Sequence, residues 1–333
     1  MTGAPRIWLL IGHRRGDNNQ VLALGEALGV PFETRTMAYR WLARPWMMLK
    51  RAGVTHLKPS ARRWLQPPWP DIVIGIGRRT VPVARWIRDQ NDGLTRLVRL
   101  GHPRAPNDWF DLVITTTQYP VPPADNVVRL ALAMNRFMTP PPPTTAERAW
   151  LDALPRPHIL LSLGGPSSMW RLDLAALADA AATLAGRAEA EGGTLIVAGS
   201  PRTPPEAWDV LRGAVEGSAR VAIVAANEIR YPVLLADADE HQVTADSVSM
   251  ISEAVMTGKP VGLIPVEPDA RGRRRIAGKP PQATRIRDPR RFWAEIEALG
   301  LVGTVDRPRA GAFDDPVKNA VEAVKARLGG LFG

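Results

Sequence analysis

The sequence predicts an α/β protein of two Rossmann-like domains, each built on a doubly wound parallel sheet. Apolar runs of strand length alternate with helical patterns along most of the chain, which is typical of βαβ units. The 333 residues, 45% of them hydrophobic, are enough for two domains with a sizeable core each. A run of four prolines at residues 140–143 separates two such series of units and predicts a stiff, extended linker.

Composition narrows the classes of function. The net charge of +10 favours an acidic partner, either phosphates, anionic lipid or nucleic acid. There is no cysteine, so disulfides, thiolate chemistry and cysteine metal sites are excluded. The apolar start at 6–11 is too short for a signal-peptide core, and no window reaches the roughly 20 apolar residues of a spanning helix. We therefore expect a protein that neither spans a membrane nor is exported.

The first βα unit consists of a strand at 6–11, a polar loop at 13–19 and a helix from about residue 20. Ligands in α/β folds bind at the carboxyl ends of strands, where this loop lies. Four of its side chains can carry chemistry: His13, Arg14, Arg15 and Asp17. His13 or Asp17 can act as a general base, and the arginines can clamp a phosphate. Alternatively, Asp17 caps the helix and the arginines are solvated.

Residues 34–70 form an insertion that is basic, rich in tryptophan and free of acidic residues. This composition is typical of a segment that lies in the interface of an anionic membrane. Packing of the tryptophans on the sheet is the alternative, and single-stranded nucleic acid is a weaker one because no nucleic-acid-binding module surrounds the segment. We expect no nucleic-acid partner. The side chains assigned to the membrane interface are Trp41, Trp46, Lys50, Arg51 and Trp64.

The sheet of the first domain resumes with strands at 71–76, 95–100 and 111–115. The sequence GHPR follows the second of these strands, so His102 and Arg104 are expected at the same carboxyl edge as His13. Together with Arg14 and Arg15 they are assigned to an acceptor or its phosphate. The glycines of the GIG turn lack the full G-x-G-x-x-G spacing, so they do not predict an NAD site.

The proline run at 140–143 marks the boundary between the domains. We place an N-terminal domain at 1–138, a linker at 139–145 and a C-terminal domain at 146–333. In the second domain a strand at 158–163 leads into the turn GGPSS, and a strand at 194–198 leads into GSPRT. Glycines allow close backbone approach to a phosphate, and hydroxyls and arginine can bind one. The turn is alternatively an ordinary βα connection. The candidate phosphate-binding residues are Gly164, Gly165, Ser200 and Arg202.

Residues 240–266 read as strand, loop, helix, turn and strand in one compact unit. Asp246 or Ser247 can cap the helix, whose N-terminus suits a phosphate, and Ser249 lies in its first turn. Glu253, one to two turns on, can accept hydrogen bonds from ribose hydroxyls. The alternative is that Asp246 only caps and Glu253 is a solvated charge.

The last basic run, ARGRRRIAGKPP at 270–281, predicts a mobile, solvated loop, with or without a polyanion bound by its arginines. Residues 289–299 and 316–328 carry apolar residues at helical spacing and are expected to pack without chemistry. Asp237 and Asp239 have D-x-D spacing but follow an apolar helix, so we interpret them as loop charges and predict no metal site or cofactor.

Several segments together resemble the elongated-mitochondria fission-protein family and its bacterial relatives. They are GHRRGDNNQ, GHPR, FDLVI, LGG, VTADSVSMISEA and TGKPV. That family looks related to two-lobed glycosyltransferases of the GT-B type, which need no D-x-D metal motif and build lipid-linked sugars. The resemblance implies two lobes facing a cleft, with a nucleotide-diphosphate sugar bound in the C-terminal lobe. It implies Glu253 on the ribose, Gly164, Gly165, Ser200 and Arg202 around the diphosphate, and 247–249 near the donor.

The sequence therefore predicts a metal-independent glycosyltransferase that moves a sugar from a nucleotide-diphosphate sugar to a lipid-linked or envelope-glycan acceptor. We expect it in the bacterial cytoplasm, bound peripherally to the inner face of the cytoplasmic membrane. Plant members of the family are implicated in recruiting fission machinery, so a non-catalytic membrane scaffold is the main alternative. A nucleotide-sugar epimerase is another, since it shares the donor site but needs no aromatic insertion.

Overall fold

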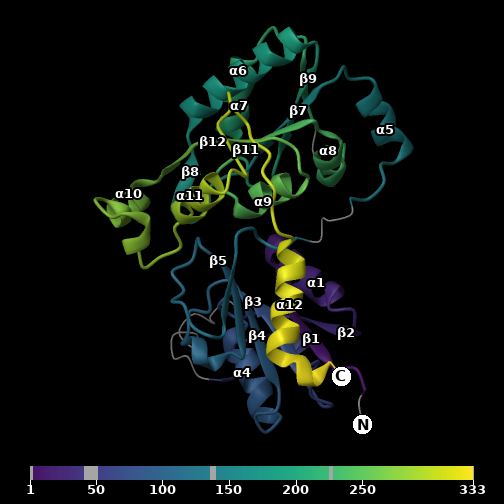
Figure 1. Ribbon diagram of the computed structural model, residues 1–333, viewed down its shortest axis with the longest axis vertical. Coiled ribbons are helices and arrows are strands. Elements are labelled where there is room, and N and C mark those ends of the chain that lie inside the picture. Colours follow the sequence, from purple (N-terminus) through teal and green to yellow (C-terminus); the bar gives the residue numbers. More distant parts are fainter. Residues whose placement is uncertain (1–2, 41–51, 136–139, 225–227, 333) are drawn as a thin grey trace. The chain divides into compact units, whose positions relative to one another are not determined.

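The computed structural model describes residues 3–40, 52–135, 140–224 and 228–332 (Figure 1). The chain divides into two compact units. Unit 1 comprises Met1–Arg136, Arg285–Arg287 and Asp314–Gly333, and unit 2 comprises Phe137–Thr284 and Asp288–Phe313. Each unit is an α/β domain with its own parallel sheet, as the sequence predicts.

The sheet of unit 1 has six parallel strands in the order β2-β1-β3-β4-β5-β6. They are β1 (Ile7–Ile11), β2 (Phe32–Thr36), β3 (Ile72–Ile76), β4 (Arg96–Leu100), β5 (Leu112–Thr116) and β6 (Val127–Leu130). The chain begins with β1, the second strand from one edge, and adds β2 on one side and β3 on the other, so the loops after β1 and β3 are neighbours at the carboxyl edge.

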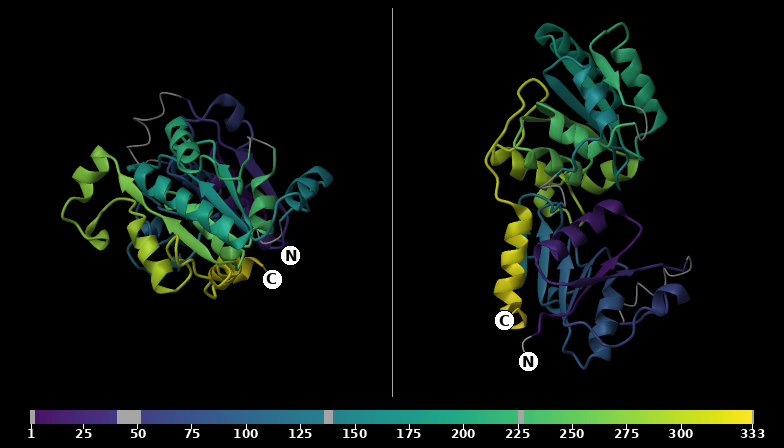
Figure 2. Two further views of the ribbon diagram at one scale, coloured as in Figure 1. Left: turned by 90° about the horizontal axis from the view of Figure 1, so that it is seen from above. Right: turned by 90° about the vertical axis from the view of Figure 1, so that its right-hand side faces the viewer.

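Helices cover both faces of this sheet, because successive residues of each central strand point to opposite faces. Ile7 and Leu9 of β1 face the core that contains α1 (Arg15–Ala27) and α12 (Pro316–Leu328). Trp8 and Leu10 face the other core, which contains α4 (Val81–Gln90) and the short α3 (Pro59–Arg62). Figure 2 shows α12 running alongside the strands of unit 1.

The sheet of unit 2 has five parallel strands in the order β10-β9-β7-β11-β12. They are β7 (His158–Leu163), β9 (Thr194–Gly199), β10 (Val221–Ile223), β11 (Glu240–Thr244) and β12 (Val261–Ile264). The helices of this unit are α5 (Thr145–Asp152), α6 (Leu174–Glu191), α7 (Pro205–Ala214), α8 (Tyr231–Asp237), α9 (Val248–Met256), α10 (Ala270–Ile276) and α11 (Arg290–Ala298). A small antiparallel ribbon pairs β8 (Trp170–Leu172) with β13 (Val266–Pro268).

Local sequence explains where the helices of unit 2 begin and end. Thr144 and Glu147 form a reciprocal capping box at the start of α5. Asp173 accepts from two backbone amides at the start of α6, and Gly192 ends that helix with φ of 70°. These signals fix the ends of elements whose apolar faces then pack on the sheet.

The structure corrects three expectations about elements. Helix α1 begins at Arg15 rather than near residue 20, so Asp17 lies in its first turn. Residues 270–276 of the expected mobile loop form α10, which Asp269 caps by accepting from the amide of Gly272 at 2.6 Å. The sequence reading also missed the edge strand β6, which is short and partly exposed.

The C-terminal helix corrects the expected domain boundary. Helix α12 buries Val317, Ala320 and Val324 in the core of unit 1, so the second domain does not extend to 333. An amphipathic helix shows that it needs a partner but does not show which sheet supplies one. In the described part of the chain, no helix is long and apolar enough to cross a membrane.

Candidate functional site

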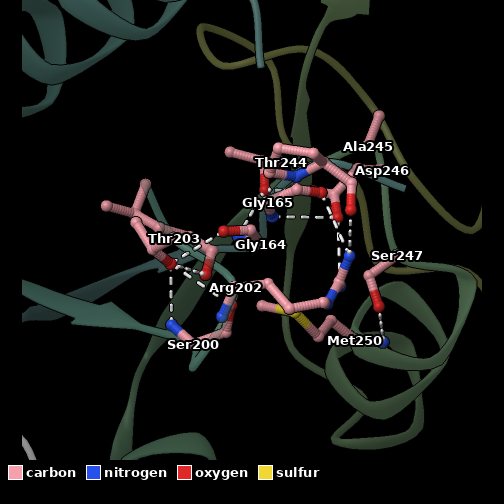
Figure 3. A network of polar contacts seen from close by, with 12 residues as sticks. Gly164, Gly165, Ser200, Arg202, Thr203, Thr244, Ala245, Asp246, Ser247 and Met250 are labelled. Atoms are coloured by element: carbon pink, nitrogen blue, oxygen red, sulfur yellow. Dashed lines mark hydrogen bonds and ion pairs between the residues drawn. The ribbon is translucent and has the colours of Figure 1, made fainter. Parts of the chain in front are cut away.

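Three loops meet at the carboxyl edge of the unit 2 sheet (Figure 3). They follow β7, β9 and β11, which are adjacent strands because β7 pairs with both of the others. The amide of Gly164 donates to Thr244 Oγ1 at 2.8 Å, and the amide of Gly165 donates to Asp246 Oδ2 at 3.1 Å. The structure therefore brings the GGPSS turn against the loop that leads into α9, as the topology predicts.

Asp246 is the buried centre of this edge, with its side chain fully covered. Besides the Gly165 amide, it accepts hydrogen bonds from Thr244 Oγ1 at 2.8 Å and Arg202 Nη2 at 3.2 Å. Burial raises the pKa of Asp246 despite these donors. Asp246 is not the helix cap: Ser247 is, since its Oγ accepts from the amide of Met250 at 3.4 Å. Asp246 holds the loops together instead.

The two glycines are required by close packing. A Cβ on Gly164 would lie 2.1 Å from Asp246 Oδ1, and a Cβ on Gly165 would lie 2.0 Å from the carbonyl oxygen of Arg202. No real Cβ tolerates such distances. Their amides are bound within the protein, to Thr244 and Asp246, so these two N–H groups do not form the phosphate cradle that the sequence suggested.

The GSPRT loop is fastened to the glycine turn. Arg202 donates through Nη1 to the carbonyls of Gly165 at 3.0 Å and Pro166 at 3.2 Å, while 44% of its side chain stays exposed. Thr203 Oγ1 donates to the carbonyl of Gly164 at 2.7 Å and accepts from the amide of Ser200 at 2.8 Å. Thr203 is absent from the expected site residues, although a hydroxyl three residues after Ser200 in a turn is a signal for such a bond.

Helix α9 presents its N-terminus beside these loops. The amides of Val248 and Ser249 lie in the first turn, where a helix offers its N–H groups no carbonyl acceptor. They form the positive end of the helix dipole. Ser249 and Glu253 are four residues apart, so they share one face of α9, and both are half-buried.

Tyr231, which follows the strand β10 in the chain, extends the same edge. Its hydroxyl, at the start of α8, donates to Ser162 Oγ of β7 at 3.1 Å. Burial and the neighbouring Glu253 carboxylate raise the pKa of Tyr231 well above its usual range. Glu253 is half-buried and close enough to Tyr231 to affect its pKa, and its binding role stays a prediction.

Asp17 is a partly buried carboxyl at the carboxyl edge of unit 1, and a Cβ on Gly77 would lie 3.9 Å from its Oδ2. Burial raises the pKa of Asp17, against the opposing charges of Arg14, Arg99, Arg287 and His13. It is not the cap of α1: the N-cap residue is Arg14, which makes no side-chain capping bond. A carboxyl with a raised pKa among cations is a candidate proton acceptor.

The segment that follows β1 also contains His13, Arg14, Arg15 and Asn18. His13 and Arg14 are exposed near Asp17, whereas the side chain of Arg15 lies outside the described residues. Asn18 fixes the loop, since its Oδ1 accepts from the Gly12 amide and its Nδ2 donates to the Gly12 carbonyl, both at 2.8 Å.

Arg99 is the residue of this edge that the sequence reading missed, and it is only 2% exposed. It donates to the carbonyls of Gly77 at 3.2 Å and His102 at 3.1 Å and to Thr80 Oγ1 at 2.9 Å. Burial lowers the pKa of Arg99 to about 10. An arginine inside the apolar strand RLVRL is the signal that could have identified it, because a buried charge is rare without a role.

The GHPR loop carries His102 and Arg104, as expected, to this same edge. His102 Nδ1 accepts from the amide of Arg104 at 3.0 Å, which places the ring proton on Nε2. Arg104 has φ of 54°, a left-handed conformation that is uncommon for residues with a side chain. Burial, Arg104 and Arg99 lower the pKa of His102 to about 4, so the ring is neutral at pH 7.

The basic, tryptophan-rich insertion is only partly described. Trp41, Trp46, Lys50 and Arg51 lie outside the described residues. Trp64 is 55% exposed with Arg63 over its ring, whereas Trp69 packs edge-on against Trp8 and Trp86. The described tryptophans therefore divide between a surface position and the core, and the membrane interface stays a prediction.

The D-x-D pair has a structural role. Asp237, the last residue of α8, accepts from His158 Nδ1 at 2.7 Å, and Asp239 pairs with Arg156 at 2.7 Å. The interpretation of Asp237 as a loop charge was therefore wrong, because its carboxylate is buried against β7. Across the described ranges, no group of three His, Asp or Glu side chains could hold a metal ion.

Solved structures share the fold of the chain at low sequence identity. A putative UDP-N-acetylglucosamine 2-epimerase from Listeria monocytogenes aligns with a TM-score of 0.56 and 12% identity, over 98% of this chain and 97% of that one. UDP-GlcNAc 2-epimerases from Methanocaldococcus jannaschii and Neisseria meningitidis, the latter bound to UDP-GlcNAc, align with TM-scores of 0.54 and 0.51. Their identities are 10% and 11%, and each alignment covers 98% of this chain and 100% of the other. The fold is thus GT-B-like.

Sequence relatives identify the family. Mitochondrial fission protein ELM1 of Arabidopsis thaliana is 32% identical over 242 residues, which are 64% of this chain and 56% of that protein. An uncharacterized protein of Rickettsia prowazekii is 31% identical over 114 residues, 32% of this chain and 30% of that protein. The chain thus matches about half or less of the length of these relatives. Residues 15–279 match the family model described as Mitochondrial fission ELM1, so the chain belongs to that family.

Proposed function

We propose that this protein is a GT-B-like glycosyltransferase that moves a sugar from a nucleotide-diphosphate sugar to a lipid-linked or envelope-glycan acceptor at a membrane. The observation that carries the proposal is the polar edge of unit 2, where a glycine turn, the N-terminus of α9 and Glu253 lie together. The UDP-GlcNAc bound in the Neisseria structure of the same fold supports a nucleotide sugar as ligand. The acceptor, the membrane and a cytoplasmic location are parts of the proposal.

The donor diphosphate would bind at the N-terminus of α9. The first-turn amides and the positive end of the helix suit its charge, and Ser249 can add a hydroxyl. The exposed part of Arg202 lies next to this loop, held by Asp246 at 3.2 Å. Glu253, on the face of α9 shared with Ser249, would accept hydrogen bonds from the ribose hydroxyls. The internally bonded glycines would shape the site rather than donate to phosphate.

Asp17 would be the general base of the transfer. Its carboxylate would take the proton of the acceptor hydroxyl while the acceptor oxygen bonds to the sugar C1. The bond from C1 to the diphosphate oxygen breaks, and the leaving diphosphate keeps the electron pair, stabilised by α9 and Arg202. Burial raises the pKa of Asp17 toward the working pH, which makes the carboxylate a stronger base. His13, exposed in the same loop, is the second candidate.

Calorimetric titration with UDP-, GDP-, ADP- and CMP-sugars tests the donor site. We expect one donor to bind and Glu253→Ala to weaken it by about tenfold or more, which corresponds to the loss of about 1.4 kcal/mol. Glu297→Ala, an exposed glutamate on α11, is the matched control and should bind like the wild type. No binding across the panel would remove the proposal.

Two variants separate the candidate bases. Asp17→Asn keeps the shape of the side chain but cannot accept a proton, so transfer should fall by about a hundredfold or more with donor affinity unchanged. His13→Ala should reduce transfer by less if Asp17 is the base. If Asp17→Asn turns over normally and His13→Ala does not, the role passes to His13.

Two other functions are distinguished by the products. The solved neighbours named as UDP-GlcNAc 2-epimerases favour an epimerase as second candidate, for which the same donor would be converted to its epimer with no acceptor present. The relative named a mitochondrial fission protein favours a membrane scaffold. In that case the protein would float with anionic vesicles and leave every nucleotide sugar unchanged.

A further inference from the structure

The carboxyl edge of the unit 1 sheet contains a buried positive charge with neutral partners. All the hydrogen bonds described for the Arg99 guanidinium go to backbone carbonyls and a threonine hydroxyl, and Arg99 Nε is buried without a partner. Desolvating a cation costs several kcal/mol unless an opposite charge compensates it. Asp17 is the carboxyl that interacts with Arg99, and Arg14 and Arg287 act on the same carboxyl, so Arg99 does not have it alone.

Further cations converge on the same edge from four separate segments. Arg14, Arg99 and Arg287 each act on Asp17, and Arg104 acts on Arg99. Arg79 lies over the ring of Tyr39 at 5.1 Å. Among the described residues, five arginines and one carboxyl make up this cluster, which we call the unit 1 basic edge and which thus has more positive than negative side chains.

Two further observations indicate that the edge is arranged for a ligand. One of its loops is held in an uncommon conformation, with φ of 54° at Arg104. Backbone strain of this kind concentrates at ligand-binding and active sites. Burial lowers the pKa of His102, and the charges of Arg104 and Arg99, which lie close to its ring, lower it further.

We propose that the unit 1 basic edge binds a phosphomonoester group, which Arg104 and Arg14 contact directly. Arg99 positions the two loops through the carbonyls of Gly77 and His102 and adds its buried charge. A dianion supplies the compensation that a single carboxyl cannot, and guanidinium groups from separate loops match its oxygens. This inference rests on the proposed function only in identifying the phosphate as part of the acceptor.

A purely structural role for Arg99 makes a different prediction. An arginine that only ties loops together needs no second exposed arginine and no free anion. The decisive variants therefore leave Arg99 in place. Arg104→Asn removes the charge and keeps a residue that tolerates the left-handed conformation. Arg96→Gln is the matched control. Arg96 lies at the amino end of β4, the strand that contains Arg99, is 52% exposed and pairs with Asp111 at 3.2 Å.

The test is a titration of the full chain with inorganic phosphate at pH 7 and constant ionic strength, followed through the ring signals of the five histidines by NMR. We expect the His102 signals to move while those of buried His241, in unit 2, stay fixed. Arg104→Asn should weaken the apparent affinity by about tenfold, as expected for the loss of one charged contact, and Arg96→Gln should not change it. Arg99→Met, if it folds, should abolish the response.

Competition identifies the source of the phosphate. Displacement by glycerol phosphate indicates a water-soluble phosphomonoester, and displacement by phosphatidylcholine vesicles that contain phosphatidic acid indicates a lipid headgroup. A His102 signal that ignores phosphate, or an equal affinity in Arg104→Asn, would overturn the inference. Phosphate binding here with no nucleotide sugar bound in unit 2 would keep this site and remove the transferase. Nucleotide-sugar binding in unit 2 without phosphate binding in unit 1 would keep the donor site and remove the phosphate site.

Discussion

The two parallel sheets differ in strand order, and their carboxyl edges bury opposite charges. In unit 2 the buried group is the Asp246 carboxylate, which accepts from an amide, a hydroxyl and Arg202. In unit 1 it is the Arg99 guanidinium, which donates to carbonyls and a hydroxyl. The unit 2 edge is thus satisfied within the protein, whereas the unit 1 edge retains an excess of positive charge.

The two edges therefore differ in how the protein satisfies its own buried charge. A satisfied buried carboxylate fixes the loops of unit 2, so that a ligand meets a rigid surface and the N-terminus of α9. In unit 1 the buried arginine shares one carboxyl, Asp17, with other cations, and under our proposal a bound anion balances the remaining charge. Under the proposed function, the edge of unit 2 takes the donor and the edge of unit 1 takes the acceptor.

The largest expected effect comes from breaking the packing of the unit 2 edge. Gly165→Ala places a Cβ 2.0 Å from the carbonyl oxygen of Arg202, so the loops must separate. We expect unit 2 to lose about 2–3 kcal/mol of unfolding free energy and the donor to bind at least tenfold more weakly. Urea unfolding and calorimetry measure the two effects.

Gly186→Ala is the matched control for that substitution. Gly186 lies in α6 with nothing within 4 Å of an added Cβ, so alanine should stabilise the helix by up to about 1 kcal/mol. If both variants bind the donor like the wild type, the close approach of the glycine turn to Arg202 has no part in the site.

A second pair of variants separates packing from surface in the unit 1 insertion. Trp69 contacts Trp8 and Trp86, so Trp69→Ala should cost about 2 kcal/mol of stability. Trp64 is 55% exposed, so Trp64→Ser should change stability by less than about 0.5 kcal/mol and weaken binding to anionic vesicles. Vesicle flotation and thermal unfolding distinguish the two. Equal flotation of Trp64→Ser and wild type would exclude Trp64 from a membrane interface.

A smaller effect distinguishes two histidines whose pKa lies near 4 for different reasons. The pKa of His102 is lowered by burial and by Arg104 and Arg99, whereas that of His241 is lowered mainly by burial, with both ring nitrogens unpartnered. The unfolded chain binds a proton near pH 6.5 and the folded chain only near 4, so His241 removes stability as pH falls through that window.

We therefore expect wild type to lose about 1.4 kcal/mol more than His241→Leu between pH 7.5 and 5.5. The effect comes from the proton that the unfolded histidine binds and the folded one does not. Urea unfolding at the two values of pH measures it. Identical losses in the two proteins would show that burial does not control His241.

The sequence predicted the unit 2 edge better than the unit 1 edge. Gly164, Gly165, Arg202, Asp246 and Ser247 meet in the structure because each follows a strand, and adjacent parallel strands deliver their loops to one edge. What could not be foreseen is which groups bond to which. The amides of the glycines are used internally, and Asp246 is a buried anchor rather than a cap.

In unit 1 the sequence placed His13, Asp17, His102 and Arg104 correctly at one edge but missed Arg99. A residue inside an apolar strand is assigned to the core by pattern, and pattern does not show that a charge is buried there without a carboxylate. Helix α12 was likewise assigned to the wrong domain, since an apolar face does not specify its partner. Both misses concern contacts between residues far apart in sequence.

The measurement that tests the central claim most directly is hydrogen–deuterium exchange of the full chain with and without a bound nucleotide sugar. The account predicts slower exchange in the peptides that cover 164–168, 200–203 and 245–253, the edge of unit 2. Inorganic phosphate should instead slow exchange around 12–17 and 101–104, the edge of unit 1. Protection of the unit 1 edge by the nucleotide sugar with none at the unit 2 edge would contradict the assignment of donor and acceptor.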